Sequence, residues 1–215
     1  MTDIWGDTAN LAVHVLVNLV EANRRPGMVV VEVGVWKGKT ALLWLPIVKE
    51  VGGRGILIDH FKGSPDEHPL PGTGCPWDPA KADMRCWDLA ERIIAAGFEG
   101  VAEIWQTSSE RAARELVDGS CCDIVFIDAD HRRSAVALDI AFYLPKVRPG
   151  GILCGHDISS LADAGELPSE TWEIDYMREG PFKERHCGVD RAVWEVFGST
   201  GVKILSDVWV WRKPL

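Results

Sequence analysis

The sequence lacks any apolar run long enough to span a membrane, and it does not open with the basic stretch of a secretion signal. Positive charge is also scarce, because 23 lysines and arginines stand against 32 aspartates and glutamates, for a net charge of −9. A chain of that sign does not attract a phosphate backbone, and no basic run interleaved with aromatic residues occurs. We therefore expect a cytoplasmic protein that binds neither a membrane nor nucleic acid.

The sequence also lacks the cysteine spacings that mark zinc sites and redox dithiols. Its six cysteines form no CxxC pair and no cysteine–histidine zinc pattern. Several of them fall at or in apolar strand-like segments, where a free thiol behaves as a small hydrophobic side chain. We predict that all six are reduced and structural: Cys75, Cys86, Cys121, Cys122, Cys154 and Cys187.

What is present is the composition of an ordinary globular protein, with 47% hydrophobic and 26% charged residues among 215. We expect one domain over 1–215, because this length suits a single core and no linker divides the chain. Strand-like apolar runs alternate with helical patterns. Strands are predicted at 28–33, 55–59, 101–105, 123–128, 152–155, 202–205 and 208–211, and helices at 10–22, 39–49, 81–96, 109–117, 134–147 and 189–197. This alternation predicts an α/β, Rossmann-like three-layer sandwich whose seven-stranded sheet is mostly parallel and ends in an antiparallel hairpin.

Three segments lie outside this alternation. The first, 1–27, carries the N-terminal helix, and a Pro-Gly-Gly turn at 149–151 is expected before the fifth strand. The other two, 62–88 and 158–187, are long, polar stretches that follow the carboxyl ends of strands. Loops in that position commonly carry function, so we expect both to act as lids that select the substrate.

Ionisable residues close four of the predicted parallel strands: Glu32, Asp59, Asp128 and the pair His156-Asp157. Ligands of open α/β sheets bind at this edge, outside the carboxyl ends of the strands. A buried carboxylate without a partner is unfavourable, so a rim rich in acids requires water, a cation or a polar ligand. Local structural roles can explain one or two of these residues, but the whole set favours a ligand site.

A turn with two glycines joins the first strand to its helix and reads E-x-G-x-x-x-G from Glu32 through Gly34 to Gly38. Glycine permits a tight turn and a close approach of a ligand to the backbone, although such a turn can also be purely structural. The spacing is not the G-x-G-x-x-G of dinucleotide-binding loops. Asp59 ends the next strand, where an acid accepts hydrogen bonds from the hydroxyls of a nucleoside ribose. Capping or loop stabilisation is the alternative role for Asp59.

Three stretches resemble the class I S-adenosylmethionine-dependent methyltransferases: VVVEVGVWKGKT at 29–40, DIVFIDADH at 123–131 and LPKVRPGGILCGHD at 144–157. The closest likeness is to a bacterial branch with F-I-D-x-D-H and P-G-G-x-x-x-G-H-D motifs, many of whose members methylate hydroxyls of small molecules or sugars. The first stretch is common to many methyltransferases, and the other two are more specific.

The resemblance implies a binding residue for each part of the cofactor. Glu32, Gly34 and Gly38 would shape the methionine pocket, and Asp128 would border it. The remaining contacts would come from Asp59 on the ribose, Phe61 on the adenine, and Thr107 and Ser108 near the adenine amino group. The chain reads Gln-Thr-Ser at 106–108 where Gly-Asp-Ser is common, which weakens the last assignment.

The resemblance also implies a metal site and a catalytic group. Catechol-type relatives bind a divalent cation at positions that correspond to Asp128, His156 and Asp157. Oxygen ligands suit Mg²⁺, whereas histidine suits a softer cation, so the metal stays open, as does a simple hydrogen-bonding role for His156. His131 stands where relatives carry a basic catalytic side chain, and we expect it, with Asp128, to deprotonate or polarise the acceptor hydroxyl. An exposed histidine at a helix start is the alternative.

The sequence therefore predicts S-adenosylmethionine-dependent O-methylation of a small-molecule or sugar hydroxyl, with a divalent cation as an open addition. The acceptor and any self-association into a homo-oligomer are not specified. Two other functions are compatible with the same predicted sheet, that of a nicotinamide-dependent oxidoreductase and that of a non-catalytic nucleoside-binding domain. The glycine spacing counts against the first, and turnover would exclude the second. Another activity on the same scaffold is also open, because a fold does not determine a function.

Overall fold

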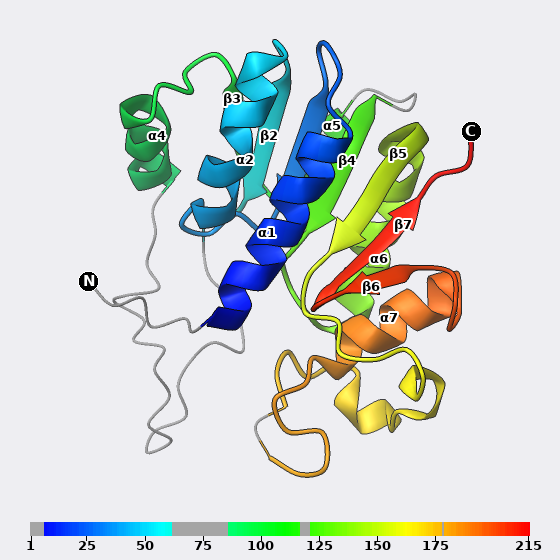
Figure 1. The fold of residues 1–215 in the computed structure, drawn as a ribbon. Coiled ribbons are helices and arrows are strands. Elements are labelled where there is room, and N and C mark those ends of the chain that lie inside the picture. The colour runs from blue at the N-terminus through cyan, green and yellow to red at the C-terminus, as the bar shows by residue number, and fades with distance from the viewer. Residues whose placement is uncertain (1–6, 62–85, 117–120, 178) are drawn as a thin grey trace.

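The computed structural model describes residues 7–61, 86–116, 121–177 and 179–215. Within these ranges, seven strands form one sheet in the order β3-β2-β1-β4-β5-β7-β6 (Figure 1). The first five strands run parallel to one another, and β7 is antiparallel to both β5 and β6. Their bounds are β1 Val29–Val33, β2 Arg54–Asp59, β3 Ala102–Gln106, β4 Cys122–Ile127, β5 Val147–Gly155, β6 Lys203–Leu205 and β7 Val208–Arg212. The predicted fold class is confirmed.

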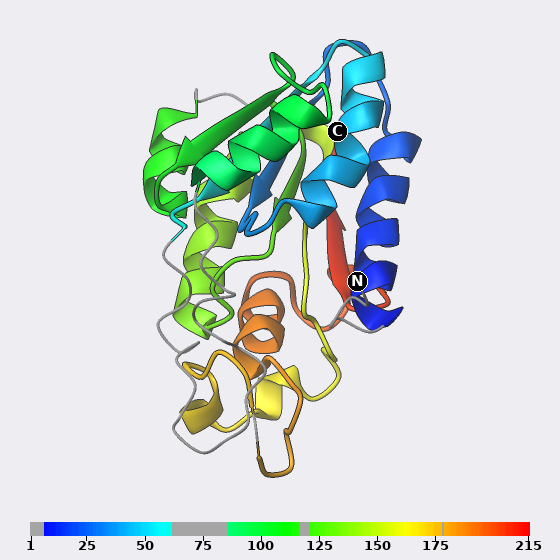
Figure 2. The same ribbon diagram turned by 90° about the vertical axis from the view of Figure 1, so that its left-hand side faces the viewer.

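Helices cover both faces of the sheet, so the fold has three layers (Figure 2). Residues of α1, α2 and α4 pack with alternate residues of the central strands, and residues of α5, α6 and α7 pack on the other face. The central strands read as continuous apolar runs because both of their faces are buried in this way. The helices are α1 Asp7–Ala22, α2 Lys39–Glu50, α4 Cys86–Ala95, α5 Ser109–Glu115, α6 Arg133–Tyr143 and α7 Cys187–Phe197.

The sequence prediction is wrong where α6 meets β5. The helix was expected to continue to Val147, but it ends at Tyr143 and a 3₁₀ turn, Leu144–Lys146, follows. Pro145 lacks the N–H that the next α-helical hydrogen bond requires. The Pro-Gly-Gly stretch at 149–151 is part of β5 and not a turn before it. Gly150 has a φ of 73°, and its N–H donates to the carbonyl of Lys213, so the tail of the chain holds this irregular start of the strand.

The hairpin that closes the sheet was predicted correctly. Its connection, Ser206-Asp207, lacks glycine, and Ser206 adopts a φ of 60° in its place. Most of the other element ends differ from the prediction by one or two residues, and α7 begins two residues earlier than expected, at Cys187. Two differ by more: α1 begins at Asp7, three residues before the predicted start, and α4 is described from Cys86, where 81 was predicted.

Segment 62–88 lies almost entirely outside the described residues. Segment 158–187 is described except for 178, and beyond two 3₁₀ turns, Ala164–Glu166 and Ser169–Thr171, it is irregular until α7 begins. It lies past the carboxyl end of β5, at the lower edge of Figure 1. Arg185 anchors it, with ion pairs to Asp163 at 2.8 Å and to the buried Asp190 at 2.5 Å.

Two expectations from composition can be compared with the described part of the chain. None of its helices is long and apolar enough to cross a membrane. The cysteines whose side chains are described, Cys121, Cys122, Cys154 and Cys187, are free thiols, as predicted. Cys75 and the side chain of Cys86 lie outside the described residues.

Candidate functional site

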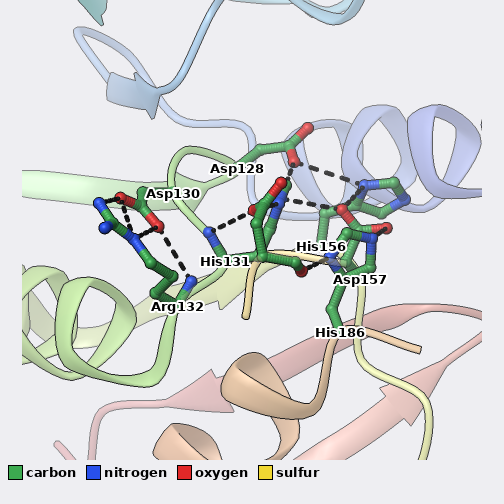
Figure 3. Close-up of polar contacts among 8 residues, drawn as sticks. Asp128, Asp130, His131, Arg132, His156, Asp157 and His186 are labelled. Atoms are coloured by element: carbon green, nitrogen blue, oxygen red, sulfur yellow. Dashed lines mark hydrogen bonds and ion pairs between the residues drawn. The ribbon is translucent and has the colours of Figure 1, made fainter. Parts of the chain in front are cut away.

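The structure brings together four of the residues singled out in the sequence. Asp128 follows β4, and His156 and Asp157 follow β5, the neighbouring parallel strand. His131 lies between Asp128 and the start of α6 and points toward the same place (Figure 3). The carboxyl ends of two adjacent strands therefore build one cluster of acids and imidazoles, as their position along the strands predicts.

Both ring nitrogens of His131 face carboxylates. Nδ1 lies 2.8 Å from Oδ1 of Asp175, and Nε2 lies 3.0 Å from Oδ2 of Asp157 and 3.7 Å from Oδ1 of Asp128. Nε2 is buried, and it has no aligned hydrogen-bond partner among the described residues despite these short distances. His131 is therefore not the exposed histidine that was the alternative role.

His156 is held in the same manner from the other side. Its Nδ1 lies 3.4 Å from Oδ1 of Asp128 and 3.3 Å from Oδ2 of Asp157, and its Nε2 lies 3.1 Å from Oδ2 of Asp207. The same two carboxylate oxygens thus face one nitrogen of His131 and one nitrogen of His156.

Backbone features at the ends of the strands make this convergence geometrically feasible. Asp157 has a φ of 60°, which is uncommon for a residue other than glycine and is typical of functional sites. A Cβ at Gly155 would come within 2.7 Å of the ring of Trp209, and a Cβ at Gly188 would come within 2.3 Å of the carbonyl oxygen of His131. Glycine at 155 and 188 therefore lets β7 and α7 approach the site closely.

The cluster perturbs the protonation of its members. Burial opposes a charge on His131, but its contacts with Asp128, Asp157 and Asp175 outweigh burial and hold its pKa well above the usual value. The pKa of His156 is raised in the same way, mainly by Asp128. Burial favours a protonated Asp157, yet the two imidazoles hold its pKa well below the usual value. The cluster therefore pairs the ionised carboxylates of Asp128, Asp157 and Asp175 with protonated His131 and His156.

Sequence reasoning missed three residues of this site: Asp175, His186 and Asp207. His186 packs its ring 4.3 Å from that of His131, its Nδ1 lies 2.6 Å from the carbonyl oxygen of Asp175, and its Nε2 is 3.8 Å from Oδ1 of Asp157. Asp175 and His186 belong to the irregular segment 158–187, and Asp207 belongs to the hairpin turn. The one available signal was that this segment follows a strand end that carries other candidate residues.

Asp59 anchors the glycine turn. Its Oδ2 accepts hydrogen bonds from the N–H groups of Val35 at 3.0 Å and Trp36 at 2.8 Å, and its Oδ1 accepts one from Phe61 at 2.6 Å. A carboxylate has about four acceptor positions, so capacity for a further hydroxyl donor remains. Residues 60 and 61, which follow Asp59, are neither helix nor strand, and Phe61 adopts a φ of 56°.

The two glycines of the turn meet different neighbours. Gly34 has a φ of 86°, and a Cβ there would lie 1.9 Å from the carbonyl oxygen of Asp128. Gly38 has a φ of 70° at the start of α2, where a Cβ would meet the side chain of Leu89 at 2.3 Å. Packing against backbone therefore requires glycine at 34, which places the turn directly against the end of β4, whereas the left-handed backbone conformation favours glycine at 38.

Glu32 lies beneath this rim and not on it. Its side chain is buried beside Trp44, whose Nε1 donates to Oε2 at 2.7 Å. Burial raises the pKa of Glu32 to about 8, against the hydrogen bond from Trp44, and the charges of Asp128 and Asp59 add to the rise.

Thr107 and Ser108 follow β3. The N–H of Thr107 donates to the carbonyl oxygen of Asp59 at 3.1 Å, which places it beside the glycine turn. Ser108 is the N-cap of α5, and its hydroxyl accepts from the N–H of Arg111 at 3.3 Å. The cap is a structural role that exists whether or not a ligand contacts this residue.

A profile described as a methyltransferase domain matches residues 31–158, which hold the glycine turn, Asp59 and the Asp128–His131–His156–Asp157 cluster. The chain belongs to this methyltransferase family. The resemblance noted in the sequence is thereby confirmed. No curated protein sequence matches the chain significantly.

Solved structures of O-methyltransferases share the fold of this methyltransferase. A Staphylococcus aureus protein proposed to be a caffeoyl-CoA O-methyltransferase is 13% identical, with a TM-score of 0.62 over 94% of this chain and 83% of its own. A Bacillus cereus O-methyltransferase in complex with SAH is 15% identical, with a TM-score of 0.57 over 97% and 80%. The O-methyltransferase TomG of Streptomyces achromogenes, involved in tomaymycin synthesis and solved with SAM, is 15% identical, with a TM-score of 0.56 over 95% and 79%. At these identities the likeness shows the fold alone.

Proposed function

We propose that this methyltransferase transfers the methyl group of S-adenosylmethionine to a hydroxyl oxygen of a small molecule or sugar. The observation that carries the proposal is the contact between Gly34 and Asp128, which joins the glycine turn to the acid–imidazole cluster at one edge of the sheet. A methyl donor held at the turn would present its reactive end to the cluster. The family and the structural relatives solved with SAM or SAH support this assignment.

The cofactor half of the site is assigned as follows. Asp59, with acceptor capacity left after three backbone hydrogen bonds, would bind the ribose, and Phe61 beside it would pack on the adenine. The turn from Gly34 to Gly38 would take the methionine part, with the buried Glu32 supporting it through Trp44 from below. Thr107 and Ser108 would border the adenine, and Asp128 would stand between the cofactor and the acceptor.

A divalent cation fits the cluster. Among the described residues, the buried Nε2 of His131 has no aligned hydrogen-bond partner, and the oxygens of Asp128 and Asp157 lie around it. Asp128, Asp157 and His156 are the proposed ligands from the sequence, and the geometry adds His131. A cation bound there would stabilise the developing negative charge on an acceptor oxygen.

His131 is better placed to polarise than to accept a proton. Both of its nitrogens face carboxylates, so neither is directed toward an open space that an acceptor hydroxyl could enter. Methyl transfer from a sulfonium is an in-line displacement, in which the main contribution of an enzyme is alignment of the reacting atoms. We infer that His131 and Asp128 fix the position and charge of the acceptor oxygen. Segments 158–187 and 62–88 are the proposed acceptor-selecting lids. Segment 158–187 carries the exposed Tyr176, whose ring lies 5.0 Å from that of His186.

Binding and turnover test this proposal together. In calorimetry, S-adenosylhomocysteine should bind and NAD should not, which separates a methyltransferase from a nicotinamide-dependent oxidoreductase. With deuterated-methyl S-adenosylmethionine and a panel of phenols, catechols and sugars, mass spectrometry should detect a labelled methyl ether, which a non-catalytic nucleoside-binding domain would not produce. His131→Ala should lower kcat by about 10²–10³-fold, the usual loss when a group that stabilises charge in the transition state is removed, and leave cofactor affinity nearly unchanged. Normal turnover in that variant would assign activation of the acceptor to another group.

A further inference from the structure

The two imidazoles of the cluster are held by one repeated arrangement. Each presents one nitrogen to the same pair of oxygens, Oδ1 of Asp128 and Oδ2 of Asp157. Each has its other nitrogen on a carboxylate outside that pair, which is Asp175 for His131 and Asp207 for His156. Neither Asp175 nor Asp207 follows from the sequence motifs, and they come from segments far apart in the chain.

A cation at the inner ends of the two rings would replace their inner protons, and the outer carboxylates fix the tautomer that each neutral ring would then adopt. A neutral imidazole that donates its proton to an outer carboxylate must direct its lone pair at the other end. Donation from Nδ1 of His131 to Asp175 directs the lone pair of Nε2 inward, and donation from Nε2 of His156 to Asp207 directs the lone pair of Nδ1 inward. Four electron-rich atoms then face one another, so a positive charge must lie among them, either the inner protons of two imidazolium rings or a bound cation that replaces those protons.

The position of Nε2 of His131 is the independent observation that points to a ligand. It is buried and lies 3.0 Å from Oδ2 of Asp157, yet it is not aligned for a hydrogen bond with that oxygen. A shared proton requires alignment of donor and acceptor, whereas ligands of a metal ion converge on a common centre and need not point at one another. Histidine ligands of metals commonly donate their second N–H to a carboxylate in this way.

We propose that Asp175 and Asp207 are positioning residues for a two-nitrogen, two-oxygen cation site made of His131, His156, Asp128 and Asp157, and that this site prefers Co²⁺ or Zn²⁺ over Mg²⁺. The preference follows from the ligands, since imidazole favours borderline transition cations and Mg²⁺ favours an all-oxygen shell. The inference rests on the proposed function only in placing a cation at this end of the sheet.

The proposal also gives segment 158–187 and the β6–β7 hairpin turn a structural role in the cation site. Asp175 lies in segment 158–187, which Arg185 ties to Asp163 and Asp190, and Asp207 lies in the turn where Ser206 adopts a φ of 60°. The site therefore forms fully only when that segment and the hairpin are both in place. Asp130 provides a matched control. It lies in the loop between β4 and α6 that also carries Asp128 and His131, but it pairs with Arg132 and faces away from the histidines (Figure 3).

Metal binding without cofactor or acceptor tests the inference. Chelator-treated protein is titrated with Co²⁺ and followed by visible absorption, then with Zn²⁺ and with Mg²⁺ in calorimetry. The expected affinity for Co²⁺ and Zn²⁺ exceeds that for Mg²⁺ by on the order of 100-fold. Asp175→Asn and Asp207→Asn should each weaken Co²⁺ binding by about 10–100-fold, whereas Asp130→Asn should leave it unchanged. Asp175→Glu, which keeps the acceptor, should retain binding closer to the native protein.

Three results would overturn the inference. Mg²⁺ binding as tight as that of Co²⁺ would remove the preference, and equal Co²⁺ affinity in Asp175→Asn, Asp207→Asn and Asp130→Asn would remove the positioning role. Loss of Co²⁺ binding with loss of the folded circular dichroism spectrum in both Asn variants, with no recovery in Asp175→Glu, would show that these residues only maintain the fold. Binding of S-adenosylhomocysteine, measured separately, reports on the proposed function, so failure of one claim is distinguishable from failure of the other.

Discussion

Asp123 and Asp128 stand near the two ends of the same strand, β4, and their surroundings differ in kind. The side chain of Asp123 has no exposed surface and accepts hydrogen bonds from Arg25 at 2.5 Å, from Arg148 and from the N–H of Val29 at 2.8 Å. Within the described part of the chain, the ion pairs of Asp128 are with imidazoles, at 3.4 and 3.7 Å. Arginine is permanently charged, so the first acid is neutralised at any pH, whereas the second depends on groups that can lose a proton or bind a cation.

The difference separates an acid that stabilises the fold from one that is available for chemistry. At the amino end of the sheet, two arginines and a backbone donor satisfy one carboxylate. At the carboxyl end, Asp157, Asp175 and Asp207 join Asp128, and the described partners of these four acids are chiefly three histidines. A structural cluster is complete without a ligand, and a functional cluster is not. Substitution at each end should therefore have different consequences.

The largest expected effect is on catalysis at the carboxyl end. Asp128→Asn should lower kcat by about 10³-fold, because it removes a proposed cation ligand and a charge beside the acceptor oxygen. The free energy of unfolding, measured by heat or urea, should change by no more than about 1 kcal/mol, because the carboxylate is partly exposed and its ion contacts are long. A variant that keeps its kcat, or one that fails to fold, would contradict the functional assignment of this end.

The complementary change is Asp123→Asn at the amino end. An amide cannot accept from both arginines and the N–H of Val29 as a carboxylate does, so the free energy of unfolding should fall by about 3 kcal/mol. Urea denaturation measures this loss. Below the unfolding transition, kcat should match that of the native protein, since Asp123 is at the far end of the strand. Reduced kcat in the folded variant would show that the two ends are coupled.

Asp59 tests a residue that combines both kinds of role. Asp59→Ala should weaken S-adenosylhomocysteine binding by about 30- to 150-fold, equivalent to about 2–3 kcal/mol for a charge-assisted hydrogen bond to ribose. It also removes three acceptor contacts from the backbone, so some loosening of the glycine turn is expected. Asp59→Asn is the control, because its one amide oxygen can still accept from Val35 and Trp36, while the charge and the acceptor for Phe61 are lost. If calorimetry finds that the folded Asp59→Ala variant binds S-adenosylhomocysteine with unchanged affinity, Asp59 does not bind the ribose.

The expected change that is smallest per step, one pH unit at a time, is the pH dependence of stability from Glu32. Its pKa of about 8 in the folded protein lies above the ordinary value of 4.5, so the folded state retains a proton that the unfolded state has lost. Its stabilising contribution is complete below pH 4.5 and falls by about 1 kcal/mol per pH unit as pH rises toward 8. Glu32→Gln, which keeps an acceptor for Trp44, should remove this slope. If the free energy of unfolding, measured by urea denaturation, has the same slope against pH in the native protein and in Glu32→Gln between pH 5 and pH 8, Glu32 is not the source of the slope.

The comparison also explains what the sequence could predict. The strands of an α/β sheet are buried on both faces, so they read as apolar runs, and the residues that close them are placed at the rim by the strands themselves. Asp128, His131, His156 and Asp157 could therefore be assigned to one site in advance. Their closeness depends only on two adjacent parallel strands and the loop after one of them.

Asp175, His186 and Asp207 could not be assigned in the same way. The first two lie in a segment without helical or strand periodicity, whose path depends on long-range ion pairs such as Arg185 with Asp163. Asp207 looked like an ordinary turn residue, and its role depends on where β7 pairs with β5. The start of β5 was misread for a similar reason, because its Gly150 is held by Lys213, more than sixty residues later in the chain. Contacts of this kind leave no local pattern.

The most direct test of the central claim is calorimetric titration of the native protein with S-adenosylhomocysteine in the presence of excess NAD. The account predicts saturable binding at one site that NAD does not reduce, that Asp123→Asn preserves and that Asp59→Ala weakens by about 30- to 150-fold. Absence of binding to the folded protein, or displacement by NAD, would contradict the claim that the carboxyl end of this sheet is the site of a methyltransferase.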